Sequence, residues 1–123
     1  MRDDAATLER LKADVRAFVG ARDWTRFHRP KDLAVGLAIE AAELLEVFQW
    51  QDPDAGATRQ DARQMRRVRE ELADVLHYTL NLANVLEIDL ATALADKMRQ
   101  NEAAYPVDAA RGNARKQPGF AQE

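Results

Sequence analysis

Two pairs of acidic residues share one spacing, and both lie among apolar residues. Glu40 and Glu43 belong to the stretch LAIEAAELLEVFQW. Glu71 and Asp74 belong to the stretch EELADVLHY. Residues three apart on a helix project from the same side, one turn above the other, and these pairs fall on or beside the positions at which apolar residues recur every three or four residues. The pattern therefore predicts two helices that direct carboxylates toward the interior of the protein.

Four such carboxylates can converge if the two helices pack antiparallel, as the short connection between them favours. Removing an unpaired charge from water costs several kcal/mol, so the acids must either hold protons with raised pKa values or bind cations. Oxygen ligands without cysteine or a suitable histidine select hard ions such as Mg²⁺ or Mn²⁺. Because Mg²⁺ usually shares its coordination shell with substrate phosphates, the acid pairs indicate phosphoryl chemistry.

Other interpretations of these acids remain open at this point. Acid pairs are common on solvated helix faces, where Lys or Arg side chains neutralise them. A ferritin-like di-iron bundle needs Glu-x-x-His on two helices, and neither His28 nor His77 follows a glutamate at that spacing. The rival from another class is a non-catalytic helical dimerisation module whose acids pair with arginines across an interface.

Four amphipathic segments must position the acids. The periodicity and the cap residues predict helices over the following ranges: Leu8 to about Gly20, about Pro30 to about Trp50, about 62 to 87, and from the N-cap Asp89 to Pro106. The polar stretches between them, 21–32 and 51–62, are predicted to be loops. No β-type alternation or internal repeat occurs, so the expected fold is all-α, of four-helix-bundle type. We expect one domain over 1–106 and a flexible tail over 107–123.

Composition narrows the class of protein. A chain of 123 residues with 46% hydrophobic residues can form one modest core, and association with further copies would help to bury the rest. The net charge of −3 gives no general attraction for a nucleic acid polymer or an anionic membrane. The absence of cysteine excludes disulfides and thiolate metal sites. Without an apolar run long enough for a membrane span or a signal peptide, the expected location is cytoplasmic.

Four stretches of the sequence together resemble a known family. They are RDWTRFHRPKDL (22–33), EAAELLEVFQW (40–50), EELADVLHY (70–78) and KMRQNEAAYPV (97–107). In order and spacing they are similar to the all-α MazG-like nucleoside triphosphate pyrophosphohydrolases, most closely to the dCTP pyrophosphatase branch. The similarity extends from about Leu8 to Pro106. It implies a homodimer or homotetramer.

The resemblance implies an activity and a metal site. The implied ligands of Mg²⁺, which are also the catalytic residues, are Glu40, Glu43, Glu71 and Asp74. The implied reaction is hydrolysis of a (deoxy)nucleoside triphosphate, dCTP or modified dCTP first among them, to the monophosphate and pyrophosphate, in nucleotide-pool cleaning. A related pyrophosphatase acting on dUTP or phosphoribosyl-ATP is the alternative within enzymes. Ile39 replaces an acid that many relatives carry, so a base located there in other branches is absent.

The resemblance also implies a substrate site. The residues that match its base and sugar positions are Trp24, His28, Trp50 and Tyr78. Lys97 and Asn101, one turn apart, match the pair that contacts phosphates. Without the resemblance, the aromatic residues would be read as core packing and the polar pair as a solvated helix face. An ungapped match puts Val15 where some relatives carry a histidine, which weakens the case for strict dCTP preference, and His77 is treated as structural.

Overall fold

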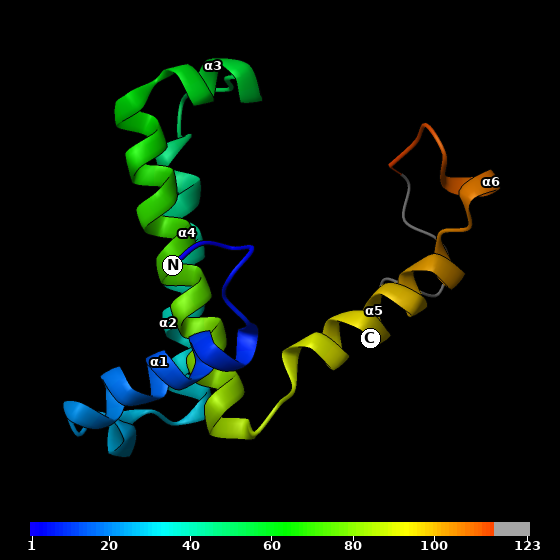
Figure 1. The fold of residues 1–123 in the computed structure, drawn as a ribbon. Coiled ribbons are helices and arrows are strands. Elements are labelled where there is room, and N and C mark those ends of the chain that lie inside the picture. Colours follow the sequence, from blue (N-terminus) through cyan, green and yellow to red (C-terminus); the bar gives the residue numbers. More distant parts are fainter. Residues whose placement is uncertain (115–123) are drawn as a thin grey trace. The chain divides into compact units, whose positions relative to one another are not determined.

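The computed structural model describes residues 1–114, and the regular elements in this range are all helical (Figure 1). They are α1 (Leu8–Ala21), the 3₁₀ turn η1 (Thr25–Phe27), α2 (Pro30–Val47), α3 (Ala55–Gln60), α4 (Ala62–Leu86), α5 (Leu90–Ala104) and α6 (Val107–Ala110). The chain forms two compact units, Met1–Glu87 and a second that begins at Ile88. The predicted all-α fold is confirmed. None of the helices in the described range is both long and apolar enough to cross a membrane.

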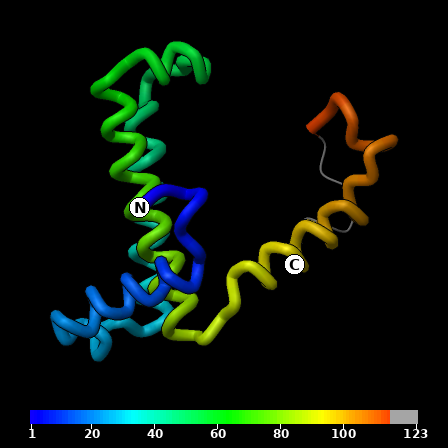
Figure 2. Tube along the Cα trace, viewed as in Figure 1, coloured from blue at the N-terminus to red at the C-terminus, as the bar shows by residue number. Residues whose placement is uncertain are grey.

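The first unit is built on the pairing of α2 with α4. These helices make the most extensive contact between any two elements, and α1 also packs on α4. Figures 1 and 2 show α2 running toward α3 and α4 returning beside it, so the two helices are antiparallel, as predicted. This arrangement brings the middle of α2, which carries the first acid pair, alongside the middle of α4, which carries the second.

The hydrophobic core of the first unit is small. The buried apolar residues are Val15, Val19, Leu33, Val47, Leu80 and Ala83, contributed by α1, α2 and α4. Large apolar side chains elsewhere on the same helices are exposed, among them Ile39 and Leu45 on α2 and Leu72 and Leu76 on α4. Amphipathic helices are stabilised mainly by burying their apolar face. One copy of this unit therefore leaves apolar helix surface uncovered.

The helix starts follow from local chemistry. Asp61 caps α4 by accepting a hydrogen bond from Gln64 N at 3.0 Å, and Asp89 caps α5 by accepting one from Thr92 N at 2.9 Å. Pro30 is the first residue of α2, where its missing N–H leaves no helical bond unmade. The predictions for Pro30 and Asp89 are thus confirmed.

The predicted helix boundaries fail in two places between α2 and α4. α2 ends at Val47 rather than near Trp50, because 48–51 form tight turns and Trp50 has left-handed backbone (φ 69°). The stretch 51–62, predicted to be a loop, contains α3. This short helix has no apolar stripe and depends on its N-cap, Asp54, whose carboxylate accepts from Ala57 N at 2.8 Å.

The second unit consists of α5, α6 and the residues that connect them. α5 ends just before Tyr105 and Pro106, as predicted. The stretch that follows, predicted to be a flexible tail, begins with the one-turn helix α6. Its flexibility stays a prediction. The rest of that prediction concerns 115–123, which lie outside the described residues.

Candidate metal and nucleotide site

Three of the four predicted acids lie together where α2 and α4 face each other. Glu40, Glu43 and Glu71 each offer one carboxylate oxygen, and these oxygens all lie within 4.8 Å of one another. All three side chains are half-buried. We call these residues the acid cluster. Asp74, the fourth predicted ligand, is exposed and lies outside this set, although its charge acts on two of the three acids.

The environment of the acid cluster opposes the charged form of its members. Burial, then hydrogen bonding and repulsion from Glu43, then repulsion from Asp74 and Glu71, raise the pKa of Glu40 to about 7. Burial and the charge of Glu43 are likewise the main causes that raise the pKa of Glu71. At neutral pH the acid cluster therefore retains protons or requires a positive partner.

No side chain in the described part of the protein supplies that partner. One carboxylate oxygen of Glu40 and one of Glu71 are buried without a hydrogen bond. Ion pairs such as Arg10–Asp14, Arg26–Asp23 and Arg99–Asp96 form elsewhere among residues 1–114 and do not involve the cluster. Buried polar atoms normally have partners. Carboxylate oxygens alone, without thiolate or imidazole, are the donors that Mg²⁺ and Mn²⁺ prefer, so the acid cluster fits a hard divalent cation.

A cavity of about 290 Å³ adjoins the acid cluster. Its lining residues come from α1, the loop around η1, α2 and α4: Phe18, Trp24, His28, Glu40, Asp74, His77, Tyr78 and Asn81. We call it the aromatic cavity. It combines two of the predicted acids with three of the four predicted base and sugar residues. Flat rings next to carboxylates can accommodate a nucleotide whose base stacks on the rings and whose phosphates extend toward a cation.

Tyr78 is held in the aromatic cavity by a glycine on the facing helix. A Cβ atom added to Gly36 would lie only 2.6 Å from Cζ of Tyr78 and 2.9 Å from its Cδ1. The tyrosine ring thus packs directly on the α2 backbone at this point. The close approach explains a glycine inside a long helix, where it otherwise lowers helix stability.

The aromatic rings of the loop are also fixed by contacts. The ring of Trp24 stands edge-on to Phe18, with centroids 5.8 Å apart, and edge-on to His28, with centroids 6.4 Å apart. The guanidinium of Arg22 lies 3.8 Å from the centroid of Phe18, a cation–π contact on that ring. His28 is further held by Asn81, whose Nδ2 lies 3.0 Å from His28 Nδ1.

Trp50, the fourth predicted base and sugar residue, does not line the aromatic cavity. Trp50 lies in the turn after α2, and the residue is 93% exposed. Lys97 and Asn101 lie on α5 in the second unit, with Lys97 exposed and Asn101 half-buried.

Three residues of the aromatic cavity were missed by the sequence interpretation. The sequence interpretation assigns a structural role to His77 and no role to Phe18 or Asn81. His77 follows Asp74 by three residues, and Asn81 follows His77 by four. This spacing places all three residues on one side of α4 and could have identified them. Phe18 carries no such signal, because only the packing of α1 on α4 brings it to the cavity.

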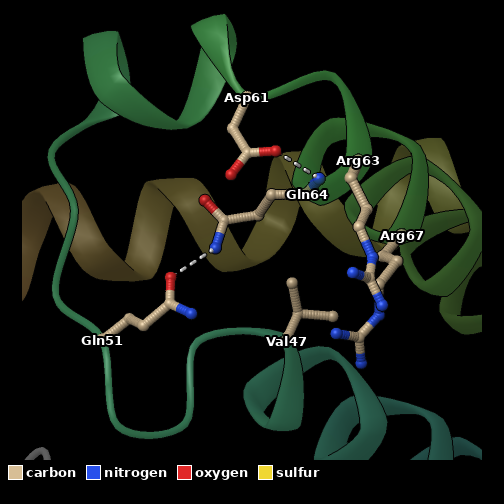
Figure 3. Close-up of a pocket in the computed structure, with 6 residues that line it drawn as sticks. All are labelled: Val47, Gln51, Asp61, Arg63, Gln64 and Arg67. Carbon is tan, nitrogen blue, oxygen red and sulfur yellow. Dashed lines mark hydrogen bonds between the residues drawn. The ribbon is translucent and has the colours of Figure 1, made fainter.

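A second hollow lies nearer the loop that joins α2 to α4 (Figure 3). It measures about 320 Å³ and is lined by Val47, Gln51, Asp61, Arg63, Gln64 and Arg67. We call it the basic hollow. Gln64 Nε2 donates to Gln51 Oε1 at 3.2 Å, and Asp61 is engaged as the N-cap of α4 (Figure 3).

Known proteins resemble this chain over most of its length. It is 39% identical to dCTP pyrophosphatase 1 of Rattus norvegicus over 109 residues, which are 88% of this chain and 64% of the relative. It is also 39% identical to dCTP pyrophosphatase 1 of Homo sapiens, over 89% of this chain and 65% of the relative. A crystal structure of a pyrophosphatase from Archaeoglobus fulgidus superposes with a TM-score of 0.74 at 40% identity, covering 86% of this chain and 98% of that one.

The chain thus spans about two-thirds of the length of the dCTP pyrophosphatases that it matches. Residues 35–118, well over half of the sequence, match the MazG-like family. The matched range includes the whole acid cluster, Asp74 and Tyr78. The chain belongs to the MazG-like family.

Proposed function

We propose that this protein is a Mg²⁺-dependent nucleoside triphosphate pyrophosphohydrolase. The observation that carries the proposal is the acid cluster, in which three carboxylate oxygens lie within 4.8 Å of one another and one oxygen each of Glu40 and Glu71 is buried without a partner. The adjoining aromatic cavity supplies a surface for a nucleoside. The relatives named as pyrophosphatases support the same reaction class.

In this proposal the residues have distinct roles. Glu40, Glu43 and Glu71 hold the cation, with Asp74 completing the set at the border of the aromatic cavity. A divalent cation held by these acids would supply neutralisation of phosphate charge and would help to orient the triphosphate for hydrolysis of the α–β anhydride. Trp24 and Tyr78 orient the base, and stacking of one base on an aromatic ring contributes about 1–3 kcal/mol.

The preferred substrate in this proposal is dCTP or a modified dCTP. Support comes from the similarity to the two dCTP pyrophosphatases and from the rings of Trp24 and Tyr78 beside Glu40 and Asp74. The products are the nucleoside monophosphate and pyrophosphate, and the role is nucleotide-pool cleaning. Lys97 and Asn101 are assigned to phosphate contacts because they match the family motif.

We further propose that the protein works as a homodimer or homotetramer. The exposed apolar residues of α2 and α4, such as Ile39, Leu45 and Leu72, would be covered by a second copy. Trp50 is fully outside the cavity of its own chain, yet it holds a left-handed backbone, a conformation that costs about 1–3 kcal/mol in a residue with a large side chain. In an assembly it could reach a nucleotide. Light scattering after size-exclusion chromatography measures the assembly, and a purely monomeric protein would contradict it.

The test of the activity is pyrophosphate release from a panel of nucleotides, with Mg²⁺ and with EDTA. We expect Mg²⁺-dependent release that is fastest with dCTP or a modified dCTP. Glu43→Gln should abolish most of it. Glu46→Gln is the matched control, because this exposed residue lies on the same helix and outside the acid cluster.

A panel without hydrolysis, in a protein that is folded and assembled, would refute the enzymatic proposal. The rival is a helical dimerisation module. Thermal unfolding separates the two, because a ligand that binds only the native state raises the midpoint. An unfolding midpoint that Mg²⁺ and a non-hydrolysable triphosphate leave unchanged would favour the module.

A further inference from the structure

Asn81 is a buried amide in the wall of the aromatic cavity. It lies on α4, and only 4% of the residue is exposed. A buried side-chain amide is costly unless its polar atoms are paired. Its Nδ2 lies 3.0 Å from Nδ1 of His28, which the chain places 53 residues earlier. The contact therefore joins the loop around η1 to the C-terminal part of α4.

The orientation assigned to the Asn81 amide indicates which nitrogen of His28 carries the proton. An amide nitrogen can only donate, so Nδ1 of His28 must accept. A neutral imidazole carries its single proton on the other nitrogen, and the partner of one nitrogen thus sets the state of the other. In this arrangement His28 is the neutral tautomer with its proton on Nε2.

The ring orientation is restricted as well as the tautomer. His28 stands edge-on to Trp24 at a centroid distance of 6.4 Å, so the indole and the amide confine the imidazole on two sides. His28 and Asn81 line the aromatic cavity together with Tyr78. With Nδ1 engaged, Nε2 is the ring nitrogen left to meet a ligand in that cavity.

We propose that Asn81 is a positioning residue that presents His28 to the nucleoside as a neutral N–H donor. The matching group on the substrate is an oxygen acceptor, either the carbonyl oxygen of a pyrimidine or the hydroxyl of the sugar. Asn81 acts only through His28. The assignment of the ligand rests on the proposed function, whereas the tautomer is a property of the free protein.

The tautomer is measured by long-range ¹H–¹⁵N NMR spectroscopy on protein labelled at histidine. The chain has only two histidines, so a His77→Gln variant assigns the signals. At about pH 8, where an ordinary histidine is neutral, we expect pyridine-type Nδ1 and pyrrole-type Nε2 for His28. A protonated Nδ1, or equal populations of the two tautomers, would overturn the proposal without any assay of activity.

Substitutions test whether the tautomer matters for the substrate. Asn81→Asp places an acceptor opposite Nδ1, so the proton should move to Nδ1 and the signals should change type. Loss of one hydrogen bond to the nucleotide should then raise KM about threefold to tenfold, with a much smaller change in kcat. An unchanged KM in a variant whose NMR signals have changed would overturn the proposal. If Asn81→Asp does not fold, Asn81→Ala tests the loss of the same hydrogen bond to His28. The NMR spectrum of the wild-type protein tests the tautomer without any variant.

Asn84 provides the matched control. It lies one turn further along α4, where it accepts from Arg16 Nη2 at 2.9 Å and donates to the backbone oxygen of Lys12 at 2.9 Å. Asn84→Asp is the same chemical change outside the aromatic cavity, so the His28 signals and KM should stay as in the wild type.

A comparison of dCTP with its 2′,3′-dideoxy analogue identifies the acceptor. If the acceptor is a base carbonyl, the rise in KM caused by Asn81→Asp should persist with the analogue; if it is the sugar hydroxyl, this rise should vanish. An equal rise in KM in Asn84→Asp would contradict the proposal.

Discussion

The aromatic cavity and the basic hollow both lie along the helix pair α2 and α4. They differ in whether the charged side chains beside them are hydrogen-bonded or hydrated. Their volumes are close, about 290 Å³ and about 320 Å³. In the basic hollow, Asp61 is satisfied as a helix cap and the exposed Arg63 and Arg67 are free to be hydrated. Beside the aromatic cavity, the carboxylates of Glu40 and Glu71 keep buried oxygens without partners.

The size of a hollow therefore does not identify the functional site of this protein. The two places differ because only the aromatic cavity adjoins half-buried carboxylates of like charge that have no positive partner among the described residues. Such an arrangement is unfavourable by itself, and it becomes favourable when a cation binds. The predictions below test this difference between the two places, beginning with the largest expected effect.

Removal of a single predicted ligand carboxylate, either in the acid cluster or at Asp74 beside it, should have the largest effect. Glu43→Gln and Asp74→Asn should each lower kcat/KM about a hundredfold or more, the size of loss seen when one electrostatic stabiliser of a transition state is removed. Glu70→Gln is a further control, because Glu70 adjoins the cluster residue Glu71 in sequence but is exposed. Near-normal turnover in both acid variants would refute the site.

The second prediction concerns stability, pH and metal. Without metal, the free energy of unfolding should fall as pH rises from about 4.5 to about 7, because Glu40 keeps its proton in the folded protein up to about 7 but loses it near 4.5 when unfolded. The folded state then binds more protons in this window, and its advantage is lost as pH passes the folded pKa. Mg²⁺ binds the deprotonated acids, so its stabilising effect should grow with pH.

Thermal unfolding over this pH range, with Mg²⁺ and with EDTA, makes the measurement. In Glu40→Gln the slope should flatten and the response to Mg²⁺ should shrink. If the wild-type protein showed no pH dependence in this window, the raised pKa of Glu40 would be wrong. If the variant kept the full metal response, Glu40 would not be a ligand of the ion.

A third prediction compares two glycines within helices. Gly36→Ala should destabilise the protein by about 1–3 kcal/mol, because the new methyl group collides with the ring of Tyr78. Gly20→Ala, where nothing lies within 4 Å, should stabilise it by about 0.4–1 kcal/mol. Denaturant unfolding measures both, and a rise in KM should accompany only the first. Stabilisation by Gly36→Ala would show that the ring does not pack on α2 in this way.

The smallest effect is expected in the basic hollow. Arg63→Gln and Arg67→Gln change exposed side chains without an ion-pair partner among residues 1–114, and such substitutions usually change stability by less than about 0.5 kcal/mol. The increase in unfolding midpoint on adding Mg²⁺ should equal that of the wild type. If Mg²⁺ no longer raised the unfolding midpoint of these variants, the basic hollow would also contribute to metal binding, and the proposed difference between it and the aromatic cavity would be wrong.

Much of the fold could be predicted from the sequence because its strongest signals are local. Apolar periodicity and cap residues such as Asp89 predict the long helices without knowledge of their neighbours. α3 was missed because a six-residue helix has no room for an apolar stripe, although Asp54 marked its start. The early end of α2 was missed because the apolar pattern continues through Phe48 into the turn.

The site was predictable to the extent that it lies on helices. The spacing that links Glu40 to Glu43 and Glu71 to Asp74 is a helical repeat, and antiparallel packing brings the pairs together. Phe18 and the His28–Asn81 contact depend on how the loop around η1 folds onto α4, which no local pattern encodes. The exposure of Trp50 could not be predicted either, because a sequence motif does not show whether a residue after the end of a helix points into the cavity of its own chain.

The most direct test of the metal site is the location of a bound ion. Crystals grown with Mn²⁺, measured at the manganese absorption edge, should show an anomalous peak about 2 Å from carboxylate oxygens of Glu40, Glu43 and Glu71, and no such peak in the basic hollow. Glu40→Gln crystals under the same conditions should show a weaker peak or none. A fully occupied manganese site elsewhere, with the acid cluster protonated and empty, would contradict the account.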